Sequence, residues 1–310
     1  MALLGLHHIH LGVPDVDASA TFLADFGLLP AGDHGDKRYF RTSGTNKYSV
    51  VLERSDEACL VSFALEVDSK DDLARAVEQH GATPAQALEG PAHGTFVNLT
   101  DPDGKIISLI HGAEKRETDA PRSPHLEVNY GHDKPRKGTS QNFVPPGPAQ
   151  LLRLGHVGLF TRDMAVSDKW YREVLGLIPS DVFYAGKPDN YVAGFYRIDR
   201  GDEWVDHHTV ALFGFGKNDL HHVSFEVQDS EAQFMAHRWM RKQKYESIWG
   251  VGRHPKGSHV FDLWREPNGY RFETFSDTDL CTSAQEVRAG PIQEQEMDMW
   301  LDQSHEPYFA

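Results

Sequence analysis

Alternating hydrophobic and polar residues mark the start of each half of the chain. Residues 6–11 and 154–159 each predict a short strand, and the matching segments 21–30 and 170–179 each predict a helix closed by a glycine. Gly27 and Gly176 stand where these helices should end, a position that favours glycine. The same order of elements in both places indicates an internal repeat.

Two further pairs of segments extend the repeat. Residues 61–68 and 222–229 alternate as strands and lead into charged amphipathic helices. Residues 100–110 and 265–275 predict a Pro-Asp-Gly or Pro-Asn-Gly turn followed by a strand. Each half of the chain therefore has the pattern strand, helix, strands, twice over.

Composition separates the two halves. A segment rich in Pro, Lys, Arg, Gly and Ser, with Pro-Pro-Gly-Pro at 145–148, predicts little regular structure between them. We expect an N-terminal module pair at 1–115, a linker at 116–149, a C-terminal module pair at 150–284 and a polar tail at 285–310. The tail carries side chains suited to packing over an opening or a neighbouring subunit: Met297, Met299, Trp300, Tyr308 and Phe309.

Charge and cysteine content exclude several classes of protein. The 310 residues include 31 Lys and Arg against 46 Asp and Glu, and the net charge of −15 disfavours nucleic acid. Cys59 and Cys281 lie in different halves and offer neither a disulfide framework nor a thiolate metal site. No segment approaches 18 consecutive apolar residues. We expect a cytoplasmic protein with no membrane partner.

The repeat carries a chemical difference between its two copies. Alignment places His156, His222 and Glu273 of the second half opposite His8, Ser62 and Ser108 of the first. Two imidazoles and one carboxylate are the ligand set that holds a non-haem ferrous ion by one face and leaves other positions open. The second half is therefore the candidate metal-binding module pair, and the first half is a pair without metal.

These segments resemble the vicinal oxygen chelate superfamily, and specifically the type I extradiol ring-cleavage dioxygenases such as catechol 2,3-dioxygenase and the biphenyl-diol enzymes. The resemblance covers residues 4–279 and implies an α+β fold of tandem βαβββ modules that form two incomplete-barrel domains. It also implies that His156, His222 and Glu273 are the metal ligands.

The resemblance further assigns roles around the metal. His208, in the segment 206–213, matches the family's acid/base histidine, and His254, in the glycine-rich segment 250–261, matches its substrate-contacting histidine. His254 is expected to donate a hydrogen bond to substrate or to oxygen. Leu263 stands where the family commonly has a tyrosine that contacts the diol, and it cannot donate a hydrogen bond. Trp249 occupies the place of an arginine in the carboxylate-binding homoprotocatechuate type, which favours a neutral or hydrophobic catechol.

The implied function is extradiol ring cleavage of a catechol by dioxygen at a mononuclear Fe(II) centre, giving a muconic-semialdehyde-type product, as in aromatic hydrocarbon catabolism. Mn(II) accepts the same nitrogen and oxygen ligands. The expected partners are a small-molecule catechol, dioxygen and further copies of the chain in a homo-oligomer.

Two other functions share this fold. A glyoxalase-type isomerase or epimerase needs a metal but no oxygen, and generally draws its ligands from two modules. A ligand-sequestering protein needs no metal at all. Most of the 18 histidines are expected to be ordinary surface or structural residues, among them His7, His8, His10, His80, His207, His221, His237 and His305. Large aromatics are usually core residues, although four are placed to line a diol pocket: Phe183, Tyr184, Trp204 and Trp249.

Overall fold

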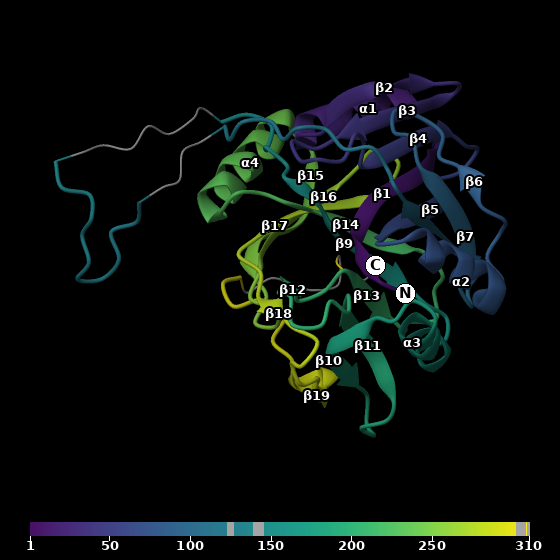
Figure 1. Cartoon of the computed structure of the whole chain (residues 1–310). Helices are drawn as coiled ribbons and strands as arrows, with labels where there is room; N and C mark the ends of the chain where they lie inside the picture. Colours follow the sequence, from purple (N-terminus) through teal and green to yellow (C-terminus); the bar gives the residue numbers. More distant parts are fainter. Residues whose placement is uncertain (123–126, 139–145, 302–307, 309–310) are drawn as a thin grey trace.

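Two curved β-sheets, each carrying two helices, form the molecule (Figure 1). The computed structural model describes residues 1–122, 127–138, 146–301 and 308. Each sheet contains two βαβββ units, so the predicted α+β fold of tandem modules is confirmed. The predicted linker and tail residues at 123–126, 139–145, 302–307 and 309–310 lie outside the described part of the chain.

The first sheet has the spatial order β2-β3-β4-β1-β5-β8-β7-β6. Its strands are β1 (Leu3–Val13), β2 (Leu29–His34), β3 (Lys37–Arg41), β4 (Val50–Arg54), β5 (Cys59–Val67), β6 (Gln86–Ala87), β7 (Thr95–Thr100) and β8 (Ile106–His111). Helices α1 (Val16–Phe26) and α2 (Lys70–His80) follow β1 and β5.

The second sheet has the spatial order β15-β16-β17-β14-β9-β13-β11-β10-β19. Its strands are β9 (Arg153–Phe160), β10 (Ile178–Tyr184), β11 (Tyr191–Arg197), β13 (Val210–Phe213), β14 (Leu220–Glu226), β15 (Glu246–Arg253), β16 (Val260–Arg265), β17 (Arg271–Ser276) and β19 (Arg288–Pro291). Helices α3 (Met164–Glu173) and α4 (Ser230–Gln243) follow β9 and β14, and β12 (Val205–Asp206) pairs with β18 (Leu280–Cys281) as a separate ribbon.

Local sequence signals set the helix ends. Asp15, Ser69, Asp163 and Asp229 each accept a backbone N–H of the first helical turn, as helix-capping residues do. The glycine expected to end α1 does so, since Gly27 follows Phe26 directly. Helix α3 ends three residues before Gly176, whose positive φ of 76° lies in the turn that follows.

Strand register confirms the alignment of the two repeats. In the first sheet, Ala64 of β5 pairs with both His8 of β1 and Ser108 of β8. In the second sheet, Ser224 of β14 pairs with both His156 of β9 and Glu273 of β17. Ser62 and His222 each lie two residues before the shared central residue. The three proposed metal ligands and their counterparts therefore occupy equivalent places.

A single hydrophobic core runs through both sheets and their helices. Phe26 of α1 contacts Phe225 and Phe272 of the second sheet, with ring centroids 6.0 and 5.5 Å apart. Hydrogen bonds reinforce the junction, since the Tyr270 hydroxyl donates to the Gly12 carbonyl at 2.7 Å. The two module pairs thus share buried surface instead of being joined only by a linker.

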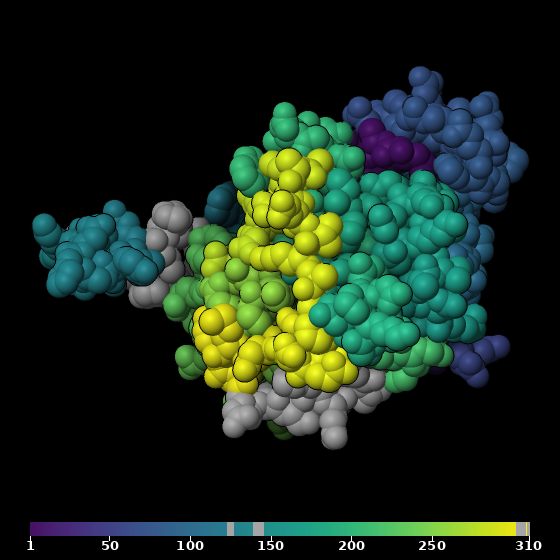
Figure 2. All heavy atoms as spheres, turned by 90° about the horizontal axis from the view of Figure 1, so that it is seen from below, coloured from purple at the N-terminus to yellow at the C-terminus, as the bar shows by residue number. Residues whose placement is uncertain are grey.

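The segment after residue 276 belongs to the second domain. Strand β19 pairs in parallel with β10, and residues 285–301 run across the surface of that domain (yellow in Figure 2). Residues 127–138, from the expected linker, extend away from the body of the molecule (Figure 1). In the part of the chain that the structure describes, no helix has the length and apolar character needed to cross a bilayer.

Candidate active site

Three adjacent strands of the second sheet carry the proposed metal ligands. His156 lies on β9, His222 on β14 and Glu273 on β17, with β14 in the middle. All three side chains are buried and line one cavity. The first and last of these residues are 117 positions apart in the sequence. The structure brings all three together because strands far apart in sequence are neighbours in the sheet.

Only one of the two carboxylate oxygens of Glu273 accepts a hydrogen bond from the described residues. Its Oε1 accepts a hydrogen bond from the Ser224 hydroxyl at 2.6 Å and lies 3.2 Å from Nε2 of His156. Its Oε2 is buried and has no hydrogen-bond partner among the described residues. A buried carboxylate oxygen without a partner is costly unless a cation neutralises it. This arrangement fits a divalent metal ion.

His259 also approaches this pair. The ligand atoms of His156, His259 and Glu273 lie within 4.8 Å of one another, close enough to hold a metal ion. His222 lines the same cavity but falls outside that compact group. His259 immediately precedes β16 and belongs to none of the repeated segments, so no sequence pattern indicates it.

The hydrogen bonds around His222 prepare it for metal binding. Nε2 of its neighbour His221 lies 2.7 Å from the carbonyl oxygen of Tyr308, which can only accept, so His221 carries its proton on Nε2. Nδ1 of His221 is then the acceptor for Nδ1–H of His222 at 2.6 Å. The lone pair of His222 is left on Nε2, as in a metal-ligating histidine oriented by an outer partner.

Gly158 makes room for the His222 ring. A Cβ atom at Gly158 would lie 2.4 Å from Nδ1 of His222, far inside contact distance. Only glycine permits this approach of β9 to the imidazole. His259 has no comparable support, because its Nδ1 is buried without a hydrogen-bond partner in the described part of the chain.

A chain of buried polar groups orients His208. Nε2 of His207 lies 2.6 Å from Oδ2 of Asp181, and a carboxylate accepts the proton there. Nδ1 of His208 lies 3.1 Å from Nδ1 of His207, and Nδ1–H of His208 can donate there in the tautomer that leaves its Nε2 free. Nε2 of His208 is then an unprotonated base. Its ring lies 4.2 Å from that of His156, centroid to centroid, so the base stands next to the proposed metal.

His254 lines the cavity, but its hydrogen bonding differs from expectation. Nδ1 of His254 lies 2.6 Å from the carbonyl oxygen of Met297, so Nδ1 carries the proton. Neutral His254 then presents an acceptor at Nε2, not the hydrogen-bond donor that the sequence analysis assigns. The reason is the carbonyl oxygen of the tail, which accepts the one proton that the neutral ring carries.

Trp249 and Leu263 lie behind the cavity wall. They pair across β15 and β16 and belong to a buried apolar cluster with Ile248, Phe261 and Tyr308. Neither is among the described residues that line the cavity, so their predicted contact with substrate stays a prediction. Phe183 does line it, together with Phe195, which the sequence analysis does not name.

Burial keeps the imidazoles of the site neutral. It lowers the pKa of His156 and of His222 to about 3, and nearby Arg153 and Arg271, respectively, contribute to the lowering. Burial also lowers the pKa values of His208, His254 and His259, with neighbouring histidines adding to the effect in each case. Neutral imidazole is the form that binds a metal and accepts a proton.

The cavity is small and the tail helps to close it. Its volume is about 30 Å³, which has room for one or two water molecules. Tyr308 and residues 295–297 of the tail line it. The cavity in this structure is therefore smaller than a catechol ring, and the tail forms part of its wall. Tyr308 is a cavity residue that no local sequence motif indicates, because it arrives from the far end of the chain.

Comparisons with known proteins identify a family profile and relatives that this chain resembles. The profile described as Glyoxalase/Bleomycin resistance protein/Dioxygenase superfamily matches residues 153–274. The chain is 28% identical over 294 residues to metapyrocatechase 2 of Cupriavidus necator, covering 93% of this chain and 86% of that protein. It is 26% identical over 235 residues to biphenyl-2,3-diol 1,2-dioxygenase of Pseudomonas sp. strain KKS102, covering 73% of each.

Solved structures share the fold over nearly the whole chain. The Mn(II)-bound glyoxalase from Novosphingobium aromaticivorans has a TM-score of 0.79 at 22% identity, covering 96% of this chain and 91% of that one. Homoprotocatechuate 2,3-dioxygenase from Brevibacterium fuscum, in its complex with 3,4-dihydroxyphenylacetate, has a TM-score of 0.79 at 18% identity, covering 99% and 92%. Residues 153–274 are therefore a domain of the Glyoxalase/Bleomycin resistance protein/Dioxygenase superfamily, and the chain is a homologue of metapyrocatechase and biphenyl-diol dioxygenase.

Proposed function

We propose that the protein is an extradiol dioxygenase, which opens the ring of a catechol with dioxygen to give a muconic-semialdehyde-type product. The observation that carries this proposal is the buried, half-satisfied carboxylate of Glu273 among neutral imidazoles. The similarity to metapyrocatechase and biphenyl-diol dioxygenase supports the reaction class. The same carboxylate argues against a metal-free sequestering protein, and the similarity to the two dioxygenases favours ring cleavage over the isomerase, which also needs a metal.

His156, His222 and Glu273 would hold the metal, Fe(II) or Mn(II). When bound, the metal would take both catechol oxygens and supply the redox chemistry that brings diol and dioxygen together. Two observations favour His222 over His259 as the third ligand. His222 lies on β14, between the strands of the other two ligands, and its hydrogen bond to His221 leaves Nε2 free to bind the metal.

His208 is the proposed base. A catechol must lose protons to bind through both oxygens, and the unprotonated Nε2 of His208 accepts one of them. Asp181 and His207 hold the ring in this tautomer, and they stabilise the imidazolium that results. The same nitrogen can return the proton later in the reaction. His254, through Nε2, accepts a hydrogen bond from the hydroxyl of the incoming diol.

The substrate class follows from the walls of the cavity. Phe183 and Phe195 line it on one side, and aromatic faces of this kind favour a planar ring. Lys256 and Glu296 both line the opening, so their charges oppose each other. We therefore propose a neutral catechol, and expect 4-methylcatechol to be a better substrate than 3,4-dihydroxyphenylacetate.

An oxygen-dependence assay tests the reaction. Protein loaded anaerobically with Fe(II) should develop the yellow colour of a ring-cleavage product from catechol or 4-methylcatechol only after air is admitted. His208→Phe should lower kcat by about 10²- to 10⁴-fold, the usual contribution of a positioned acid/base group. His80→Phe, an exposed change on α2, is the matched control. Turnover of a substrate without oxygen would favour an isomerase.

The two candidate histidine ligands are distinguished by metal content. His222→Ala should purify with little iron after reconstitution and desalting, whereas His259→Ala should keep it. Metal analysis of both variants and of the unaltered protein measures this directly. Iron lost from His259→Ala but retained by His222→Ala would assign the third ligand to His259.

A further inference from the structure

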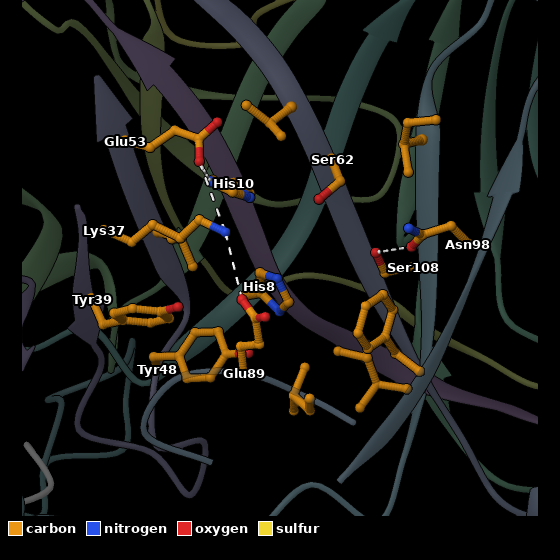
Figure 3. Close-up of a pocket in the computed structure, with 16 residues that line it drawn as sticks. His8, His10, Lys37, Tyr39, Tyr48, Glu53, Ser62, Glu89, Asn98 and Ser108 are labelled. Carbon is orange, nitrogen blue, oxygen red and sulfur yellow. Dashed lines mark hydrogen bonds and ion pairs between the residues drawn. The ribbon is translucent and has the colours of Figure 1, made fainter. Parts of the chain in front are cut away.

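The domain without metal ligands contains a cavity that is larger than the one at the proposed metal site. A cavity of about 370 Å³ occupies the concave face of the first sheet, against about 30 Å³ at the proposed metal site (Figure 3). Its volume is in the range of small-molecule binding pockets. The strands β1, β3, β4, β5, β7 and β8 all contribute to its lining.

The register of the two sheets explains the extra room. Ser62 and Ser108 occupy the places of His222 and Glu273, so two large side chains are replaced by small ones. Both serines line the cavity, and so does His8, the counterpart of His156. The first domain thus keeps the hollow of an active site while its lining offers neutral hydroxyl groups in place of metal ligands.

This cavity is not a second metal centre. Among the described residues, the group of three His, Cys, Asp or Glu side chains close enough to share a metal ion lies in the second domain. Ser62 and Ser108 offer neutral hydroxyl oxygens, which are weak ligands for a divalent ion. A ligand of this cavity must therefore be recognised by hydrogen bonds and apolar contact.

His8 offers one of those hydrogen bonds. Its Nδ1 lies 2.9 Å from Nδ1 of His7, and Nε2 of His7 is buried without a partner in the described part of the chain. An unpaired buried acceptor is tolerated better than an unpaired buried N–H, so the shared proton belongs on His7. Nε2 of His8 then carries a proton that it can donate to a ligand. Burial, with the neighbouring His7, His10 and Lys37 adding to it, lowers the pKa of His8 well below its ordinary value, so the ring is neutral.

Two strands on the far side add further polar groups. The Ser108 hydroxyl donates to the amide oxygen of Asn98 at 2.8 Å. This bond occupies the amide oxygen and leaves the amide nitrogen of Asn98 as the donor for a ligand. Both side chains lie together at one edge of the cavity, with Ser62 beside them (Figure 3). Hydroxyl and amide groups of this kind recognise a ligand hydroxyl and have no charge to offer an ion.

Aromatic and aliphatic side chains form the rest of the wall. Tyr39 and Tyr48 meet edge to face with centroids 5.0 Å apart, and Tyr48 lies 4.8 Å from the His8 ring. Phe96 and Ile110 also line the cavity. Such surfaces favour a flat aromatic ring, which gains from edge-to-face contact beyond simple burial.

The charges at the cavity disfavour an anionic ligand. Lys37 lies 3.9 Å from a carboxylate oxygen of Glu53 and 3.9 Å from one of Glu89, so its ammonium is shared between two acids (Figure 3). Glu53 also lies 3.0 Å from Nε2 of His10. An incoming carboxylate would have to displace one acid from Lys37 and would meet repulsion from the other.

We propose that this cavity is a second binding site, separate from the metal centre, for a neutral hydroxylated aromatic molecule of one or two rings. The hydroxyl of the ligand bonds to His8 and to the serine and asparagine groups opposite. The rings lie against Tyr39, Tyr48 and the aliphatic wall. The site rests on the first domain alone and needs neither metal nor turnover.

Calorimetric titration of the full chain with 2-naphthol tests the proposal, because a single hydroxyl cannot chelate the metal as a diol does. We expect one site, and dissociation constants about tenfold or more higher in Ser62→Phe and in Ser108→Phe, which fill the cavity from different strands. His208→Phe, in the other cavity, should leave the constant unchanged. Two analogues with the same rings, 2-methoxynaphthalene and 2-naphthoate, should each bind about tenfold more weakly than 2-naphthol.

His8→Ala removes side-chain volume and should also weaken binding about tenfold, so the test does not depend on the filled variants folding. Thermal melting establishes which variants are folded. The proposal is overturned if 2-naphthol does not bind, if it binds as tightly to every folded first-domain variant, or if 2-naphthoate binds better. Loss of binding only in His208→Phe would place the ligand at the metal centre and would also overturn it.

Discussion

At the scale of single residues, Glu273 has two opposite effects on the protein. Its buried carboxylate attracts a divalent ion, and without that ion the free Oε2 is a polar atom removed from water with no hydrogen bond in the described structure. A group of this kind destabilises the empty protein and stabilises the metal complex. The same residue should therefore influence metal affinity and metal-free stability in opposite directions.

Glu273→Gln separates these effects. Mutating a residue that only hydrogen-bonds to a metal ligand lowers metal affinity by roughly 10- to 100-fold. Loss of the charge on a ligand itself should therefore weaken iron binding by at least about 100-fold. In metal-free protein the change removes the unpaired charge and should raise the free energy of unfolding by about 1–3 kcal/mol. Iron titration and thermal melting measure the two quantities.

Glu246→Gln is the matched control, since its side chain is 61% exposed and pairs only with Arg265 at the surface. It should change neither quantity measurably. Equal iron affinity in Glu273→Gln and the unaltered protein would show that Glu273 is not a metal ligand.

Sequence could indicate some of the site residues and not others. His156, His222 and Glu273 stand out because the second repeat can be compared with a first repeat that lacks two of them. His259 has no such counterpart, and its approach to the metal position depends on how residues 254–259 fold back between β15 and β16. The acceptor state of His254 depends on a tail carbonyl that no local pattern reveals.

At the scale of elements, β19 shows how the tail is tied to the site. Arg288 of β19 donates two hydrogen bonds to Asp181 of β10, at 3.0 and 2.7 Å, and Asp181 in turn holds His207. Burial raises the pKa of Asp181, but hydrogen bonds from His207 and Arg288 outweigh it and leave the pKa below its ordinary value. One buried carboxylate thus joins the tail, the sheet and the proposed base.

This lowered pKa predicts how the contribution of Asp181 depends on pH. A carboxyl group with a depressed pKa in the folded state stabilises the protein above its unfolded pKa of about 4, and loses that contribution as pH falls through the folded value. The destabilisation caused by Asp181→Asn should therefore be largest at neutral pH and shrink below about pH 4. Urea unfolding of both proteins across this range measures it.

Asp202→Asn, in the exposed turn after β11, serves as the control and should show little difference at any pH. If the difference for Asp181→Asn grew as the solution became more acidic, the sign of the pKa shift would be wrong. Loss of the network should also raise the mobility of β19, which hydrogen exchange of its amides would show.

The order of elements could be predicted because the repeat supplies an internal comparison. Two sets of segments with the same periodicity and the same turns leave little freedom in how their strands align, and the observed registers agree with that alignment. Strand β19 could not be predicted in the same way. Its four residues, Arg-Ala-Gly-Pro, have no strand-like alternation, and it is a strand only because the edge of β10 is available to it.

At the scale of the whole molecule, the continuous core makes the two domains one folding unit. Phe22 and Phe26 of α1 contact Phe272, and Phe22 also contacts Tyr245, so the first domain completes the core of the second. Composition predicts a boundary between the two halves, but no sequence pattern shows which helix face packs across it. The buried face of α1 would be apolar whether the helix packed against its own sheet or against the second domain.

Phe26→Ala tests this coupling. Removing a buried phenylalanine costs about 3–5 kcal/mol, and the loss should lower the melting temperature of the whole chain in a single transition. Phe234→Ala, at a site on α4 that is 51% exposed, should have little effect. Calorimetry that resolves two transitions, with only one shifted by Phe26→Ala, would show instead that the domains unfold separately.

The fate of dioxygen tests the central claim most directly. Iron-loaded protein given 4-methylcatechol under labelled dioxygen should consume one molecule of oxygen for each catechol, and mass spectrometry of rapidly quenched product should find both labelled atoms in the opened ring. A product that forms without oxygen uptake, or that carries no label, would contradict the assignment of ring cleavage to this site.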